Sequence, residues 1–453
     1  MIIKEFVENV RSGKIDVVKN TKEVLEKIKK INKDNNYFNV ISEELALEQA
    51  KKVNKKGKLA GLPISIKDCI CVKGVESTAG SKILKNYKPV FNATAVQRLV
   101  DEGAILIGKT SQDEFGFGSF STNVGLDFKT PLNPFDKERV CGGSSGGSAG
   151  ITQKADFPHV SLSESTGGSI VNPASFCGVA GLCPTYGLVS RYGLIDYANS
   201  LDKIGIMSKN VEDIELILDV IKGHDKMDST SLNKELNKDS SVKKIGLIKE
   251  SLDVDKEVKD IILNKLKEMN IKYELVSLPL NAKYGVPCYY IIAMAEASTN
   301  LAKYCGMRYG AEEELKGSFD EYFSNIRTKY FGKEAKRRII LGTFARTAGY
   351  RDQYYLKAFK VRTLLIEEYK KAFEKYDLLV SPTMPIIAPK IKDVEKLTPI
   401  QNYMMDTLTV GANLAGLPHL SVNAGFVKKM PVGIMFTANY LNEKKLIEKG
   451  KKF

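Results

Sequence analysis

Two segments rich in glycine and serine, residues 142–148 (GGSSGGS) and 166–169 (TGGS), limit this chain more than any other feature of its sequence. Such segments bring backbone N–H groups close to a ligand and place hydroxyls beside them. A flexible linker has the same composition, but apolar residues typical of a packed core follow directly at 170–182. We therefore expect a folded site suited to acyl transfer, which needs a nucleophile, a proton relay and an oxyanion hole.

The length and composition favour a large globular protein. The chain has 453 residues, of which 43% are hydrophobic, enough for one very large domain or two to three ordinary ones. No apolar run reaches about 18 residues and the N-terminus lacks a continuous apolar stretch, so we expect neither a membrane span nor a signal peptide. The seven cysteines include no CxxC pair and no zinc pattern. We expect a reduced, cytoplasmic protein without a metal site, in which Cys69 and Cys71 share one face of a strand.

The net charge of +14, with an isoelectric point near 9.1, is compatible with a nucleic-acid partner. Most of the positive residues are lysines scattered among acidic residues rather than gathered in one basic segment. The charge therefore permits an RNA partner without establishing one.

Hydrophobic periodicity predicts alternating helices and strands from residue 59 onward. Helices are expected at 1–32, 40–56, 94–102, 211–221 and 256–269, and mainly helical structure at 286–376. A turn that leads into a short buried strand is expected at 61–68, further strands at 104–109, 243–248 and 377–382, and an exposed loop at 233–244. This alternation predicts α/β architecture, with a sheet covered by helices on both faces.

Histidine is scarce, which narrows the choice of catalytic base. Of the three histidines, only His159 is near the glycine-serine segments in the sequence, and no HExxH or dinucleotide motif is present. Lysine is the alternative base for a serine nucleophile, provided that burial favours its neutral form. Lys67 ends the apolar run 64–66 and is the candidate, although a lysine at a strand end is also commonly exposed to solvent.

The two glycine-serine segments together with Lys67-Asp68 resemble the amidase signature family. Residues 184–194 (PTYGLVSRYGL), 200–205 (SLDKIG) and 413–418 (NLAGLP) are more narrowly similar to the A subunits of tRNA-dependent amidotransferases. The resemblance extends from about residue 40 to about residue 447. It implies one domain over 1–453 with a large, mixed, twisted sheet, an N-terminal helical layer at 1–56 and the helical section at 286–376.

The resemblance also assigns roles to single residues. It places the nucleophile at Ser169, a bridging serine held by a cis peptide at Ser144 and the general base at Lys67. A proton would pass from Ser169 through Ser144 to a neutral Lys67. The backbone N–H groups that would stabilise the oxyanion belong to Thr166, Gly167, Gly168 and Ser169. The residues implied to bind the charged groups of glutamine are Arg338 and Asp406. Tyr289 is a further candidate for binding glutamine, with the adjacent Tyr290 as the alternative.

Three positions depart from the family pattern. The spacing from Ser144 to Ser169 is one residue longer than expected, so Ser145 is the alternative bridging serine. Ser165 stands where an acidic residue is usual, with Glu164 displaced by one position, and Val171 stands where arginine is usual. These departures affect the expected geometry of the loop more than the class of reaction.

The implied function is that of a glutaminase subunit in a heterotrimeric amidotransferase, a carbon–nitrogen ligase. Its ammonia would serve B-type and C-type partner subunits that amidate Glu-tRNA(Gln), Asp-tRNA(Asn) or both. No cofactor is expected in this chain, and ATP and Mg²⁺ are expected in the partner. The alternatives are a stand-alone amidase of the same family, disfavoured by residues 184–205, and a non-catalytic RNA-binding scaffold, disfavoured by the joint presence of Lys67, Ser144 and Ser169.

Overall fold

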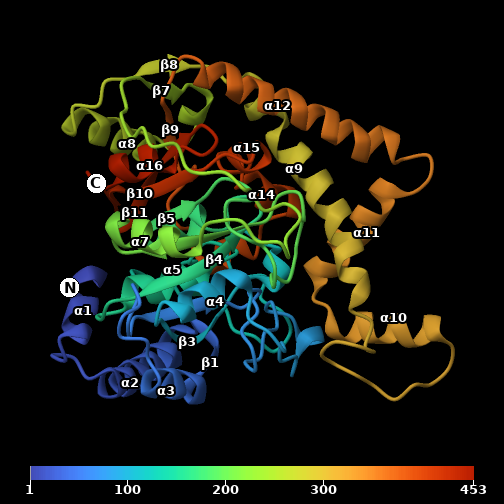
Figure 1. Cartoon of the computed structure of the whole chain (residues 1–453). Coiled ribbons are helices and arrows are strands. Elements are labelled where there is room, and N and C mark those ends of the chain that lie inside the picture. The colour runs from blue at the N-terminus through green and yellow to red at the C-terminus, as the bar shows by residue number, and fades with distance from the viewer. Residues whose placement is uncertain (1) are drawn as a thin grey trace.

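A single mixed sheet forms the centre of the molecule (Figure 1). The computed structural model describes residues 2–453, and across them eleven strands pair in the order β1-β3-β2-β4-β6-β5-β10-β11-β9-β7-β8. The strands are β1 (Phe38–Ile41), β2 (Pro63–Lys67), β3 (Ile105–Thr110), β4 (Val160–Ser165), β5 (Ala180–Cys183), β6 (Lys203–Ser208), β7 (Ile245–Ile248), β8 (Glu274–Val276), β9 (Leu378–Pro382), β10 (His419–Val427) and β11 (Met430–Ala438).

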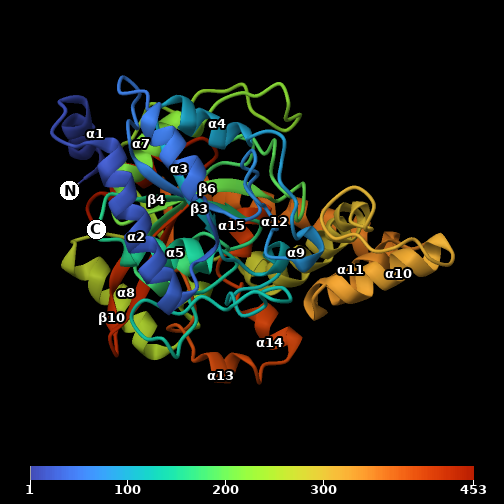
Figure 2. The same ribbon diagram turned by 90° about the horizontal axis from the view of Figure 1, so that it is seen from below.

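The helices surround this sheet (Figures 1 and 2). They are α1 (Ile3–Arg11), α2 (Val17–Asn35), α3 (Glu43–Lys51), α4 (Thr94–Asp101), α5 (Gly146–Lys154), α6 (Val171–Cys177), α7 (Val211–Ile221), α8 (Lys256–Glu268), α9 (Pro279–Asn300), α10 (Phe319–Tyr330), α11 (Lys333–Arg346), α12 (Lys357–Phe373), α13 (Ile391–Val394), α14 (Pro399–Met404), α15 (Val410–Leu414) and α16 (Glu443–Gly450). No helix within residues 2–453 combines the length and the apolar character needed to cross a bilayer.

The register of β5 and β10 shows that helices cover both faces of the sheet. Gly181 pairs with Ser421, so these two residues face the same side, and Leu420 faces the other. A Cβ on Gly181 would lie 2.7 Å from Ala174 of α6, whereas a Cβ on Gly450 of α16 would lie 2.5 Å from Leu420. Helices α6 and α16 therefore lie on opposite faces, which confirms the predicted α/β class.

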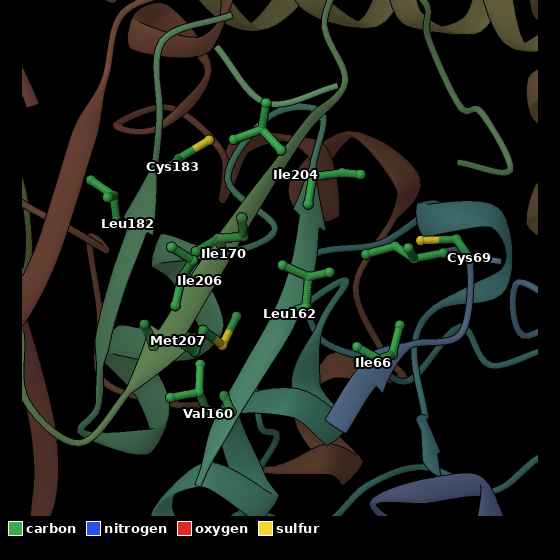
Figure 3. Packing of buried hydrophobic residues seen from close by; sticks show 14 of the residues in the cluster. Ile66, Cys69, Val160, Leu162, Ile170, Leu182, Cys183, Ile204, Ile206 and Met207 are labelled. Atoms are coloured by element: carbon green, nitrogen blue, oxygen red, sulfur yellow. The ribbon is translucent and has the colours of Figure 1, made fainter. Parts of the chain in front are cut away.

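The central strands are buried along their whole length because both faces are covered. Every residue of β2, β4, β5 and β6 is buried. Ile170, which directly follows the second glycine-serine segment and is labelled in Figure 3, packs on the sheet, because a Cβ on Gly205 of β6 would lie 2.8 Å from it and one on Gly181 of β5 would lie 3.2 Å from it. Anchoring of this kind makes the segment part of the core instead of a linker.

The N-terminal part differs from the prediction in its boundaries. Residues 1–32 were expected to be one helical stretch, but α1 ends at Arg11 and α2 begins only at Val17, after Asp16 caps it by accepting a hydrogen bond from the Lys19 N–H at 2.8 Å. Residues 38–41, partly assigned to a helix, form β1 and pair with β3. The left-handed conformation of Asn36 (φ 59°) ends α2 and lets the chain turn into that strand.

The long helices α9, α10, α11 and α12 project from the sheet in both views (Figures 1 and 2). The predicted helical section at 286–376 is confirmed, although α9 already begins at Pro279. The predicted strands within 61–68 and at 104–109, 243–248 and 377–382 correspond to β2, β3, β7 and β9. The long hairpin of β10 and β11 was not predicted, and the expectation that Cys69 and Cys71 lie on a strand was wrong, because both follow β2 in a buried turn region.

Candidate active site

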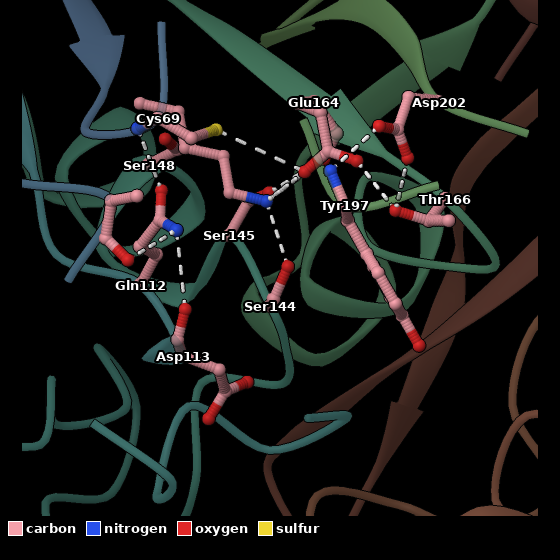
Figure 4. Close-up of polar contacts among 12 residues, drawn as sticks. Cys69, Gln112, Asp113, Ser144, Ser145, Ser148, Glu164, Thr166, Tyr197 and Asp202 are labelled. Carbon is pink, nitrogen blue, oxygen red and sulfur yellow. Dashed lines mark hydrogen bonds and ion pairs between the residues drawn. The ribbon is translucent and has the colours of Figure 1, made fainter. Parts of the chain in front are cut away.

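Lys67 is the last residue of β2 and is completely buried. Its Nζ lies 2.7 Å from Ser144 Oγ, 2.8 Å from Glu164 Oε2 and 3.0 Å from the Glu164 carbonyl oxygen. Figure 4 shows Ser144 and Glu164 at the two ends of this group of contacts. The solvent-exposed alternative for Lys67 is therefore wrong, because the strand ends inside the protein.

Ser144 is the serine that contacts the lysine. The Gly143–Ser144 peptide bond is cis, and the Ser144 carbonyl accepts a hydrogen bond from the Asp113 N–H at 3.1 Å. The hydroxyl of Ser145 instead donates to the Glu164 carbonyl at 3.1 Å. The structure thus brings Lys67 to Ser144, whereas Ser145 occupies a separate site beside β4.

The two glycine-serine segments are packed against each other. Ser169 lies two residues before the start of α6, and 6% of its surface is exposed. Gly142 has φ +78°, and a Cβ there would lie 2.4 Å from Asn172 Oδ1 and 2.8 Å from Pro173 Cα, both in the first turn of α6. Only glycine allows this approach, which brings the segment of Ser144 beside the segment of Ser169.

The candidate oxyanion segment, residues 166–169, is held in place by side chains in and next to α15. Asn413 Nδ2 donates hydrogen bonds to the Thr166 carbonyl and, at 3.0 Å, to the Leu201 carbonyl. A Cβ on Gly168 would lie 2.4 Å from Thr409 Oγ1, and one on Gly167 would lie 2.9 Å from the Tyr289 hydroxyl. Side chains at these two positions would push the backbone away from its supports.

Glu164 takes part in a buried network that the sequence did not indicate. The Thr166 hydroxyl lies 2.8 Å from Glu164 Oε1 and 2.8 Å from Asp202 Oδ1, as Figure 4 shows. Burial raises the pKa of Asp202 well above its usual range, and the nearby charge of Glu164 raises it further. Asp202 stands in the segment 200–205 quoted above, but nothing in that pattern relates it to Lys67.

Arg338 of α11 lies within an aromatic cage. Its guanidinium carbon is 5.0–5.6 Å from the ring centres of Phe117, Tyr197, Tyr290 and Tyr403, and its Nε donates to Glu334 at 2.9 Å. A cavity of about 410 Å³ opens beside it. Lys67, Ser144 and Ser169 do not line this cavity, but Asp113, which holds the Ser144 carbonyl, does.

Asp406 is buried behind the wall of the same cavity. Its carboxylate accepts a hydrogen bond from the Ser119 hydroxyl at 2.8 Å and from the Tyr290 hydroxyl at 2.6 Å. Burial raises its pKa, and the two hydroxyls partly offset that effect. Tyr290 is thus the tyrosine that contacts Asp406, whereas Tyr289 faces the glycines of the oxyanion segment.

Comparison with known proteins agrees with this geometry. The profile of the Amidase family matches residues 19–447. The chain belongs to the amidase family. It is 48% identical to the glutamyl-tRNA(Gln) amidotransferase A subunit of Archaeoglobus fulgidus over 100% of this chain and 98% of that one. It is 43% identical to the protein of the same name in Saccharolobus solfataricus over 99% and 95%.

A solved structure extends the comparison to the fold. The crystal structure of the glutamyl-tRNA(Gln) amidotransferase A subunit from Thermotoga maritima matches with a TM-score of 0.81 and 36% identity. The match covers 99% of this chain and 92% of that chain. The amidase-family fold is therefore shared over nearly all of this chain and most of that chain.

Two departures from the amidase-family pattern place uncharged side chains in the core. Ser165 and Val171 stand where an acid and an arginine are usual, and both are buried. Because both positions are uncharged, neither leaves a lone charge in the core. The carboxylate of Glu164, one position earlier, contacts Lys67 instead.

His159 takes no part in this amidase-family site. It is buried, with Nε2 3.0 Å from Ser65 Oγ, and burial lowers its pKa to about 3. A neutral ring that contacts a different serine gives no support to a serine-histidine triad.

Proposed function

We propose that this chain is the glutaminase component of a tRNA-dependent amidotransferase. The observation that carries the proposal is the contact of 2.7 Å between Lys67 Nζ and Ser144 Oγ, next to the segment of Ser169. The full-length similarity to proteins named as A subunits of glutamyl-tRNA(Gln) amidotransferase supports the choice of glutamine as substrate.

The proposed reaction forms and then hydrolyses an acyl-enzyme. Neutral Lys67 takes the proton of Ser144, Ser144 takes the proton of Ser169, and the Ser169 oxygen bonds to the side-chain amide carbon of glutamine. The N–H groups of residues 166–169 stabilise the negative oxygen of the tetrahedral intermediate. The proton returns along the same route to the leaving ammonia, and water then releases glutamate.

The recognition of glutamine is assigned to the cavity beside α11. Arg338 would bind the α-carboxylate, because its planar guanidinium pairs with a carboxylate through two hydrogen bonds. Asp406 would bind the α-ammonium through its buried negative charge. Tyr290 supports this end through Asp406, while Tyr289 is placed to order the oxyanion segment.

The ammonia would serve partner subunits of the B and C types, which would amidate Glu-tRNA(Gln), Asp-tRNA(Asn) or both. ATP and Mg²⁺ would belong to the partner, and the complex would be cytoplasmic.

The test is co-purification with these partners and a glutamine-dependent amidation assay on Glu-tRNA(Gln) and Asp-tRNA(Asn) in parallel. We expect Ser169→Ala to abolish amidation that uses glutamine and to leave amidation that uses added ammonium salt intact. Full amidase activity on small amides without partners, and none with tRNA, would favour a stand-alone amidase instead.

A further inference from the structure

The contacts around Lys67 describe an ammonium rather than a base. A lysine ammonium has three N–H donors, and the three acceptors around Nζ are Ser144 Oγ, Glu164 Oε2 and the Glu164 carbonyl oxygen. In the proposed reaction Lys67 must instead accept a proton from Ser144, so it must first lose one. The group that stabilises the ammonium therefore affects the pH at which Lys67 loses a proton and can act as a base.

Counting protons at Thr166 shows which carboxyl group carries the negative charge. The single hydroxyl proton of Thr166 can be donated to Glu164 or to Asp202, yet both lie at 2.8 Å. The other carboxyl must then donate to the Thr166 oxygen, so one of the two is protonated. The Lys67 ammonium, 2.8 Å from Glu164 Oε2, favours the ionised form of Glu164. We therefore place the proton on Asp202, whose pKa is raised by burial and by the charge of Glu164, and lowered in part by its hydrogen bond from the Ala198 N–H. Glu164 remains ionised against Lys67, and the buried cluster is neutral overall.

The other titratable groups nearby leave this pairing undisturbed. Burial keeps the Cys69 thiol, 3.9 Å from Glu164 Oε2, in its neutral form by raising its pKa well above the usual value. Asp113 accepts hydrogen bonds from the backbone of Ser121 and Asn123, and burial raises its pKa to about 6. The remaining charged neighbours have partners of their own, namely Lys109 with Asp68, Lys203 with the Leu417 carbonyl, Arg191 with Asp228 and Arg338 with Glu334. Within residues 2–453, Glu164 supplies the carboxylate paired with Lys67.

We propose that Glu164 is a positioning residue that holds the Lys67 ammonium beside Ser144 and thereby sets the pH above which Lys67 acts as a base. This inference rests on the relay of the proposed function and deepens it. It concerns a position where this chain departs from the family resemblance, which places the acidic residue at position 165. Above the threshold pH the ammonium releases one proton to solvent, and the neutral amine then accepts the proton of Ser144.

The experiment measures sulfonylation of Ser169 by phenylmethylsulfonyl fluoride in the full chain, from about pH 5 to about pH 10. In this reaction the Ser169 oxygen bonds to sulfur, fluoride leaves, and the serine proton passes through Ser144 to Lys67. An opposite charge at this distance favours the charged form by about one to three pH units. We therefore expect Glu164→Gln to lower the pH midpoint of labelling by about that amount.

A purely structural role for Glu164 would lower the labelling rate at every pH and leave the midpoint unchanged. An unchanged or raised midpoint in Glu164→Gln would overturn the proposal. Glu164→Asp keeps the charge and should keep a midpoint near that of the unmodified chain, at a lower rate. Should Glu164→Gln not fold, as judged by thermal unfolding, Glu164→Ser carries the same expectation.

Asp202→Asn is the matched control, since it replaces a protonated carboxyl group by a neutral amide in the same network. Its midpoint should not move, and a shift as large as that of Glu164→Gln would overturn the assignment of the proton. Glutamine hydrolysis is followed in parallel. A chain that is labelled at Ser169 but does not hydrolyse glutamine would refute the proposed function and leave the Glu164 test intact, whereas labelling at other serines only would refute both.

Discussion

The reaction end and the recognition end of the candidate site are built in different ways. At the reaction end, Lys67 and Glu164 lie at the ends of β2 and β4, and Ser144 lies in the first glycine-serine segment. The Lys67 ammonium and the Glu164 carboxylate are 2.8 Å apart, so this buried ion pair has no net charge. At the recognition end, Arg338 is held by ring faces and Asp406 by two hydroxyls. The first arrangement fixes atoms for proton transfer, whereas the second places an arginine, which also pairs with Glu334, and a buried carboxylate beside one cavity. Substitutions at the two ends should therefore affect different kinetic constants.

The largest effect is expected at the nucleophile. Ser169→Ala should lower kcat for glutamine hydrolysis by roughly a thousandfold or more, because no acyl-enzyme can form. Glutamine binding, measured by calorimetry, should change little. Ser163→Ala removes another buried hydroxyl, from β4, and should keep nearly full activity. Comparable activity in the Ser169 and Ser163 variants would contradict the assignment of Ser169 as the nucleophile.

Replacing the base should combine a kinetic effect with a stability effect. Lys67→Met should lower kcat by about 10²- to 10⁴-fold. It should also lower the free energy of unfolding by about 3–5 kcal/mol near neutral pH, because Glu164 is left buried without its cation. Protonation of the unpaired carboxylate removes that cost, so urea unfolding should show the loss shrinking as the pH falls. A loss of stability that does not depend on pH would contradict the ion pair.

At the recognition end, Arg338→Met should act on binding. We expect the KM for glutamine to rise by about a hundredfold, since the carboxylate of the ligand loses a buried charged partner. The fall in kcat should be much smaller. Arg346→Met is the matched control, because Arg346 lies on the same helix, donates hydrogen bonds to Ser298 and does not line the cavity. Equal changes in KM for the two variants would show that Arg338 has no special part in recognition.

Asp406→Asn should raise the KM for glutamine by about tenfold and remove its dependence on acid pH. Because burial raises the pKa of Asp406, the unmodified chain should bind glutamine more weakly as the pH falls through that pKa and the carboxylate is neutralised. A carboxyl with a raised pKa stabilises the folded state at low pH and loses that contribution as the pH rises. The Asn variant should therefore be no less stable than the unmodified chain near neutral pH in thermal unfolding.

The smallest effect is expected at Glu114, which lies where the reaction end and the recognition end of the site are joined. Glu114 accepts hydrogen bonds from Ser81 Oγ at 2.6 Å and from the Gly332 N–H at 3.0 Å, directly before α11, the helix that carries Arg338. Burial raises its pKa to about 7, so its contribution to stability is present at acid pH and is lost as the pH rises through about 7. Glu114→Gln should be more stable than the unmodified chain above that pH, by on the order of 1 kcal/mol.

The measurement for this last variant is the melting temperature at about pH 6 and about pH 8. A difference between the two chains that is the same at both values would show that Glu114 does not titrate in this range. The KM for glutamine at the higher pH would reveal whether loosening the start of α11 reaches Arg338.

Local sequence signals identified much of the reaction end. Lys67 was found at the end of an apolar strand, and the segments 142–148 and 166–169 were found by composition, because glycine is required where backbones approach closely. The β10–β11 hairpin was missed, since β11 is buried along its whole length and so lacks the alternation that marks a half-exposed strand.

The recognition end depended more on the fold. Tyr289 and Tyr290 are neighbours in α9, so the sequence alone does not show which of them contacts Asp406. The packing of α9 determines that it is Tyr290. Ser119 and Asn413 likewise have no local signal for their contacts with Asp406 and Thr166. The sequence by itself determined the class of fold and the nucleophile segments, because both follow from short-range patterns. The tertiary structure decided which serine meets Lys67 and which carboxylate pairs with it, because those contacts join residues 77 and 97 positions apart.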